Sequence, residues 1–77
     1  MIIHYTKHAE EKFFILQKHG RQILKEDITE ILKTPDECEK KDGLVFAKGM
    51  TNPGNEKWQI VYKKIDTVTS VLTMYPL

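Results

Sequence analysis

Apolar side chains recur at a helical spacing in the first part of the chain. From Thr6 to His19 most residues are good helix formers, Thr6 is a suitable N-cap, and Gly20 stands where helices commonly end. The pattern therefore predicts a first helix over this segment. Its apolar residues form a wide stripe that needs a large partner surface, namely Ala9, Phe13 and Leu16 together with Phe14 and Ile15.

A second, shorter helix is predicted between Glu26 and Pro35. Glu26 and Asp27 stand at its start, where the positive end of the helix dipole favours acidic side chains. Pro35 follows just beyond its end, because proline cannot continue a helix. The apolar stripe of this helix is Ile28, Ile31 and Leu32, with Leu24 beside it.

After Pro35 the pattern changes to that of strands and turns. Asp42-Gly43 is a turn signal between residues 37–41 and 44–48, which predicts a hairpin. Both faces of 44–48 carry apolar residues, so the sequence leaves open which face Lys48 occupies. The next segment, 51–55, is dense in turn residues and predicts an exposed loop.

Two more strands are predicted from alternating side chains. Residues 57–64 place Trp58, Ile60 and Tyr62 on one face. Residues 68–75 place Val68, Leu72 and Met74 on one face. If the helices cover the apolar face of the sheet, the opposite face is open to solvent. That face is then expected to carry Lys57, Gln59, Lys63, Thr69, Thr73 and Tyr75.

These elements predict a single α+β domain over residues 1–77. Two N-terminal helices are expected to pack on one face of an antiparallel sheet of about four strands. No apolar stretch approaches the roughly 20 residues that a membrane span needs, and residues 1–5 are too short for a signal peptide. The sequence therefore predicts a cytoplasmic protein with no membrane partner.

The formal net charge of +1 hides an uneven distribution. Residues 1–25 carry five Lys or Arg against two acids, residues 26–42 carry three against seven, and residues 44–77 carry four against two. An acidic middle thus separates two mildly basic ends, which could form one basic surface if they meet in space.

Several classes of active site are excluded by missing residues. Ser70 is the only serine and no Gly-x-Ser-x-Gly elbow surrounds it, while the lone Cys38 lies among acids that disfavour its thiolate. No phosphate-binding glycine loop is present. His4 and His8 are four residues apart, but a metal site needs three or four ligands, so neither a metal nor another cofactor is predicted.

The remaining candidates are cations and general acid–base groups that act without a metal. In RNA the 2′-hydroxyl supplies the nucleophile, so the protein need only move protons and stabilise charge on the phosphate. Residue types alone favour the simpler interpretation that the lysines form a solvated sheet face. The candidates are His8, Lys12, Lys48, Lys57, Lys63 and Tyr75.

The two ends of the chain also resemble a known group of proteins. Residues 5–12 contain Thr-Lys-His-Ala followed by a basic residue, and residues 60–62 and 71–76 close the chain with Thr-Met-Tyr-Pro. In order and spacing these segments resemble a small bacterial and archaeal family of uncharacterised domains, similar to the RelE/ParE/BrnT-like toxins. Their fold is shared with barnase and colicin nucleases.

The resemblance implies a RelE-like fold and a metal-independent endoribonuclease of a toxin–antitoxin system. An antitoxin protein and RNA are the implied partners, although ParE-type relatives act on gyrase. His8 matches the family histidine, and His8 and Tyr75 are the implied catalytic residues. Lys12 stands where the family commonly has arginine. Thr73 and Tyr75 match the terminal strand of the family. Together with Lys48, Lys57 and Lys63, which the residue types supply, Lys12 and Thr73 are the residues expected to bind RNA or its phosphates.

The chain departs from the strongly basic toxins of this group. Its only arginine is Arg21 and its pI is near 7.9, which weakens attraction to the phosphates of a ribosome. Two alternatives therefore stay open. One is a non-catalytic module that uses the same sheet face to bind a protein or nucleic acid, and the other is an inactive relative kept as a structural or regulatory domain.

Overall fold

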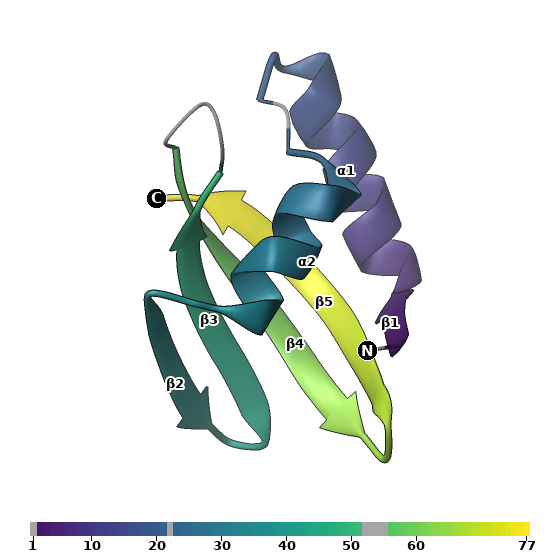
Figure 1. Cartoon of the computed structure of the whole chain (residues 1–77). Helices are drawn as coiled ribbons and strands as arrows, with labels where there is room; N and C mark the ends of the chain where they lie inside the picture. The colour runs from purple at the N-terminus through teal and green to yellow at the C-terminus, as the bar shows by residue number, and fades with distance from the viewer. Residues whose placement is uncertain (1, 22, 52–55) are drawn as a thin grey trace.

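Helices packed on one β-sheet make up the fold, as Figure 1 shows. The computed structural model describes residues 2–21, 23–51 and 56–77, so most of the loop expected at 51–55 lies outside the described residues. The elements in chain order are β1 (Ile2–Tyr5), α1 (Lys7–Lys18), α2 (Lys25–Lys33), β2 (Glu37–Lys41), β3 (Leu44–Met50), β4 (Lys57–Ile65) and β5 (Val68–Pro76).

The sheet is mixed and has five strands within the described residues, in the order β1-β5-β4-β3-β2. β2 to β5 pair antiparallel, but β1 pairs in parallel with β5, from Ile2 opposite Val68 to Tyr5 opposite Val71. The α+β class is confirmed. The expectation of a RelE-like sheet with four antiparallel strands is wrong in strand number and direction, because four residues ahead of a helix carry too short a pattern to be recognised.

Local signals explain where the helices begin. The Thr6 hydroxyl accepts a hydrogen bond from the Ala9 N–H at 3.2 Å, as expected of an N-cap. Leu24 precedes α2 and has no polar side chain, so the Asp27 carboxylate accepts the Leu24 N–H at 3.0 Å instead. Both predicted helices are therefore confirmed.

The hairpin of β2 and β3 is also confirmed. Asp42 and Gly43 have φ angles of 52° and 78°, as a two-residue type I′ turn requires. Positive φ costs little for glycine and is tolerated by aspartate, which explains why this pair can reverse the chain.

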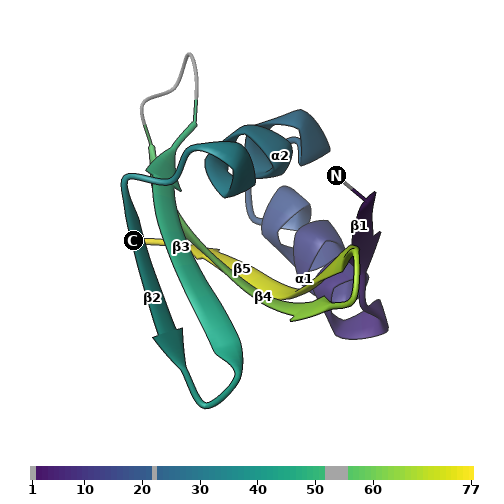
Figure 2. The same cartoon turned by 60° about the horizontal axis from the view of Figure 1, so that its bottom comes forward.

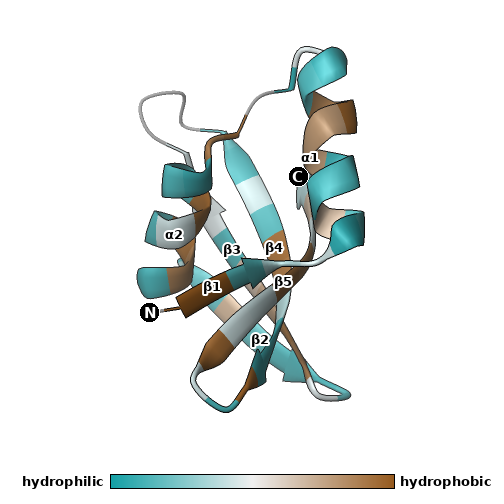
Figure 3. Cartoon of the chain, turned by 90° about the vertical axis from the view of Figure 1, so that its right-hand side faces the viewer, coloured by the Kyte–Doolittle hydropathy of each residue, from teal (hydrophilic) through white to brown (hydrophobic). Residues whose placement is uncertain are grey.

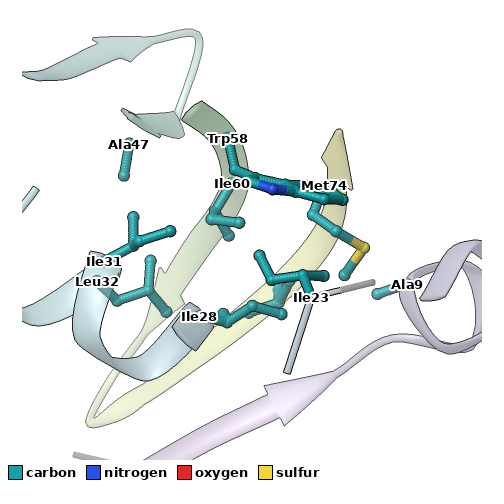
Figure 4. Packing of buried hydrophobic residues seen from close by; sticks show 10 residues of the cluster. Ala9, Ile23, Ile28, Ile31, Leu32, Ala47, Trp58, Ile60 and Met74 are labelled. Atoms are coloured by element: carbon teal, nitrogen blue, oxygen red, sulfur yellow. The ribbon is translucent and has the colours of Figure 1, made fainter. Parts of the chain in front are cut away.

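Both helices lie on the same side of the curved sheet (Figure 2). The core fills the space between the helices and the sheet. The predicted stripe of α2 is buried, and in Figure 4 it faces Ile60 and Trp58 of β4. Burial of these side chains from water is the main source of stability. The buried core consists of Ala9, Ile23, Ile28, Ile31, Leu32, Ala47, Trp58, Ile60, Val71 and Met74.

The apolar stripe of α1 is narrower than expected. Ala9 is buried and Phe13 and Leu16 pack against the core, but the Phe14 and Ile15 side chains are 59% and 51% exposed. Figure 3 shows this apolar turn of α1 at the outside of the molecule. Lys18 covers part of it, since its Nζ lies 5.1 Å from the centroid of the Phe14 ring.

A β-bulge in β5 overturns one expectation about the open face. Val61 pairs with Thr73 and Tyr62 pairs with Val71, so Leu72 has no partner on β4. This extra residue shifts the alternation of β5 side chains by one position. Residues before Leu72 therefore point to the opposite face from the one that the alternation after Leu72 predicts for them. Thr69 is consequently buried in the same cross-strand row as Ile3 rather than sharing the open face with Tyr75.

Replacing Gly49 with alanine is expected to destabilise the fold. A Cβ atom at this position would lie 2.9 Å from both Cγ1 and Cγ2 of Ile31, which is itself buried. Overpacking of this kind costs about 1–3 kcal/mol in the free energy of unfolding, measured by urea titration. In an Ile31→Ala background, where both of those Cγ atoms are gone, Gly49→Ala should cost clearly less; an equal cost in both backgrounds would contradict this explanation.

Tyr5 makes the stability sensitive to alkaline pH. Burial first, and then the Glu10 and Glu26 carboxylates, raise the pKa of Tyr5 above its ordinary 10.0. Above pH 10 the unfolded chain therefore loses this proton before the folded chain does, and stability falls as the pH rises through the folded pKa. Tyr5→Phe should reduce the loss of unfolding free energy between pH 8 and pH 11. An unchanged loss would contradict this assignment.

Candidate nucleic-acid interface

The face of the sheet opposite the helices is lined by cross-strand rows of side chains. In one row Glu37 on β2 pairs with Lys48 on β3, Lys48 with Gln59 on β4, and Gln59 with Tyr75 on β5. We call these four residues the Tyr75 row. The neighbouring residues Ala47, Ile60 and Met74 lie in the core, so the Tyr75 row points to the open face.

Tyr75 is held from two sides. The Gln59 side-chain amide donates a hydrogen bond to the Tyr75 hydroxyl, and Gln59 is only 9% exposed. The ammonium group of Lys12 lies 5.9 Å from the centroid of the Tyr75 ring, in cation–π geometry. Tyr75 therefore has a defined orientation with a positive charge beside its ring.

Lys12 can reach Tyr75 because of the way β1 ends. β1 covers β5 only as far as Val71, where the Thr6 N–H donates to the Val71 carbonyl at 3.0 Å. The Thr6 hydroxyl then donates to the Leu72 carbonyl at 3.4 Å, so α1 begins beside β5 at the point where β1 ends (Figure 1). α1 thus brings a lysine from the N-terminal segment to the open face of the C-terminal strand.

Lys48 also lies on the open face, which the sequence left undecided. Ala47 and Gly49 beside it are buried against the helices, so the Lys48 side chain points the other way. Its Nζ lies 3.5 Å from an oxygen of the Glu37 carboxylate. The Lys48 and Glu37 side chains are 36% and 64% exposed, so water screens this ion pair and it adds little stability. It nevertheless offsets the positive charge that Lys48 brings to the row.

His8 is exposed on α1, one turn before Lys12. Thr73 lies on the open face opposite Val61, in the row next to the Tyr75 row. Within the described ranges no hydrogen bond or ion pair holds the His8 ring.

The structure separates the remaining candidate lysines. Lys57 lies two residues before Gln59 on the same face of β4 and is exposed, so it extends the site. Lys63 lies four residues after Gln59, beyond the bulge and opposite Ser70. At roughly 3.3 Å per residue this separation is about 13 Å along the strand. Lys63 is consequently not a neighbour of Tyr75.

Gln59 contacts Tyr75 in the site, but it was not among the catalytic or RNA-binding residues predicted from the sequence. It alternates with the apolar residues Trp58 and Ile60, and this position already placed it on the open face. Its contact with Tyr75, however, depends on the register of β4 against β5, which the sequence does not reveal. A shallow depression of about 320 Å³ lies beside the row, lined by Glu37, Cys38, Glu39, Phe46 and Lys48.

In the part of the chain that the structure describes, no three His, Cys, Asp or Glu residues are grouped closely enough to hold a metal ion. Neither α1 nor α2 has the length and apolar character needed to cross a membrane. Comparisons of this chain with protein-family models, curated proteins and solved structures found no match. The resemblance to the RelE/ParE/BrnT-like toxins accordingly stays a prediction.

Proposed function

We propose that this chain is a toxin-type endoribonuclease that cleaves cytoplasmic RNA at the Tyr75 row without a metal ion, with an antitoxin protein as its partner. The environment of Tyr75 carries the proposal. The Gln59 amide donates to the phenolic oxygen, so the phenolic proton remains available to a substrate, and Lys12 supplies a positive charge beside it.

The proposed reaction is attack by the 2′-hydroxyl of RNA on the adjacent phosphorus. His8 accepts the proton of that hydroxyl, a bond forms between the 2′-oxygen and phosphorus, and the bond from phosphorus to the 5′-oxygen breaks. Tyr75 donates its proton to the departing 5′-oxygen, while Lys12 stabilises the added negative charge on the phosphate. The products are a 2′,3′-cyclic phosphate and a 5′-hydroxyl, and water returns the proton from His8 to Tyr75.

The composition of the open face supports RNA as the substrate. Proteins bind single-stranded nucleic acid by combining cations, which contact the backbone, with aromatic rings, against which bases stack. Lys12, Lys48 and Lys57 are the cations on this part of the face, and half-buried Phe46 lies between the cross-strand neighbours Glu39 and Val61. Threonine at position 73 adds a hydroxyl beside them.

A second candidate function is a binding module without catalysis that uses the same face. Two observations favour it: Lys48 is engaged by Glu37, and no hydrogen bond orients the His8 ring among the described residues. A catalytic base normally needs a defined position relative to the proton that it accepts. The two functions differ in one measurable property, the cleavage of RNA.

The test is incubation of the purified chain with total cellular RNA in the presence of a chelator, followed by mapping of the new ends. We expect cleavage that leaves cyclic-phosphate or phosphate 3′ ends. His8→Ala should reduce this cleavage about 100-fold or more, as loss of a general acid or base does. His19→Ala is the matched control, because His19 is an exposed histidine at the other end of α1. This variant should cleave RNA like the wild type.

Equal cleavage by His8→Ala and His19→Ala would remove His8 from the reaction. No cleavage by the wild-type chain, with or without ribosomes, would reject the ribonuclease and favour the binding module. In that case pull-down of nucleic acid and protein partners by the wild-type chain, compared with Lys12→Gln, is the deciding measurement.

A further inference from the structure

A second group of cations lies at the other end of the open face. Lys63 pairs with Ser70, and Ser70 pairs with His4 on β1. On the other side Lys41 pairs with Leu44, and the β3–β4 register continued by one residue sets Leu44 opposite Lys63. We call Lys41, Leu44, Lys63, Ser70 and His4 the basic row.

The basic row points to the same face as Tyr75. Ile3 and Tyr5 pack against the core, so His4 between them points away from it. Tyr62 likewise packs against the core, and Lys63 after it is exposed. Ser70 is only 8% exposed because its neighbours on both adjacent strands surround it.

The basic row differs from the Tyr75 row in its charge. It contains two lysines and an imidazole and no acid, whereas Glu37 offsets Lys48 in the Tyr75 row. The ion pairs found among the described residues involve Arg21, Lys25 and Lys48, none of which belongs to the basic row. At the same end of the sheet, a depression of about 330 Å³ is lined by Lys40, Lys41, Asp42, Gly43, Leu44, Val45 and Lys64. Of its three lysines, Lys41 belongs to the basic row, whereas Lys40 and Lys64 alternate with Lys41 and Lys63 along their strands and face the helix side of the sheet.

We propose that the basic row is a second phosphate subsite, which binds the RNA strand about 13 Å from the bond cleaved at Tyr75, a spacing set by four residues of β4. This inference rests on the proposed function. Lys63 neutralises one phosphate, to which the Ser70 hydroxyl and a ring N–H of His4 donate hydrogen bonds, and Lys41, two strands away on β2, neutralises a neighbouring phosphate of the RNA strand. The row between the two subsites consists of Glu39, Phe46, Val61 and Thr73, and its one acid lies at the outer edge.

The length of the strand decides whether it reaches both subsites. We would measure binding of labelled 2′-O-methyl RNA, which cannot supply the attacking hydroxyl, as a 10-mer and as a 3-mer. The variant Lys41→Gln/Lys63→Gln is compared with Lys18→Gln/Lys33→Gln, which removes the same charge from exposed helical positions. The first variant should weaken 10-mer binding about tenfold and lower the salt-dependence slope by about 0.7 for each phosphate that is no longer neutralised. The 3-mer should bind both variants alike.

If the two double variants bind the 10-mer alike, the second subsite is rejected, and the cleavage assay still decides the proposed function separately. If the wild-type chain fails to bind the 10-mer, the subsite is rejected as well. If binding depends on Lys41 and Lys63 as expected but unmodified RNA is not cleaved, the subsite stands and the ribonuclease fails.

Discussion

Replacing Ile60 with alanine is expected to lower the free energy of unfolding by about 2–5 kcal/mol. The Ile60 side chain has no exposed surface and lies in the middle of β4, between the sheet and α2. Its truncation removes buried methyl groups and leaves a cavity that the surrounding helices and strands fill only in part. A domain of 77 residues buries a small core, so this loss is a large fraction of its total stability.

The matched control is Ile65→Ala on the same strand. Ile65 is 53% exposed, so the same truncation should change the unfolding free energy by no more than about 0.5 kcal/mol. Urea titration followed by circular dichroism measures both variants. Similar values for Ile60→Ala and Ile65→Ala would mean that the core does not lie where the structure has it.

Replacing Tyr75 with phenylalanine is expected to reduce RNA cleavage by about 100- to 10,000-fold, the usual contribution of general acid–base catalysis. Under the proposed function, this substitution removes the proton given to the departing 5′-oxygen. It keeps the aromatic ring beside Lys12, so binding of 2′-O-methyl RNA should remain close to that of the wild type. The change would therefore appear in the rate of the chemical step and not in affinity.

Tyr62→Phe is the control for this experiment. Tyr62 lies on the neighbouring strand but packs against the core from the helix side of the sheet, so its hydroxyl is not on the open face. This variant should cleave RNA at the wild-type rate. If Tyr75→Phe also cleaves at that rate while His8→Ala does not, another group supplies the proton and Tyr75 serves only in binding.

Elements whose stabilising interactions join residues close together in the chain were predictable from the sequence. Thr6 and Gly20 mark the ends of α1, Asp42-Gly43 forms the turn of the hairpin, and Trp58 and Ile60 share the buried face of β4. In each case the responsible interactions lie within a few residues, such as the hydrogen bond from the Ala9 N–H to Thr6. A pattern of residue types is enough to predict structure at that range.

The candidate site was predictable only in part. The alternation of β4 and β5 placed Lys57, Gln59 and Tyr75 on one face. Residue types made His8 and Lys12 candidates, and the resemblance implied the same two residues. Neither could show that Lys12 lies over Tyr75, because that arrangement requires β1 to end at Val71 and α1 to begin beside β5. The sequence likewise did not show that Lys63 lies away from Tyr75, opposite Ser70.

The sequence by itself determined the two helices, the hairpin and the apolar face of β4, because short-range sterics, capping and alternation act between neighbours. Tertiary structure alone decided the parallel pairing of β1 with β5, the reversal of sides at Leu72 and the side on which Lys48 lies. These features depend on register between strands that are distant in the chain. Register is set by the packing of the whole core, and one unpaired residue in a strand changes which side chains reach the open face.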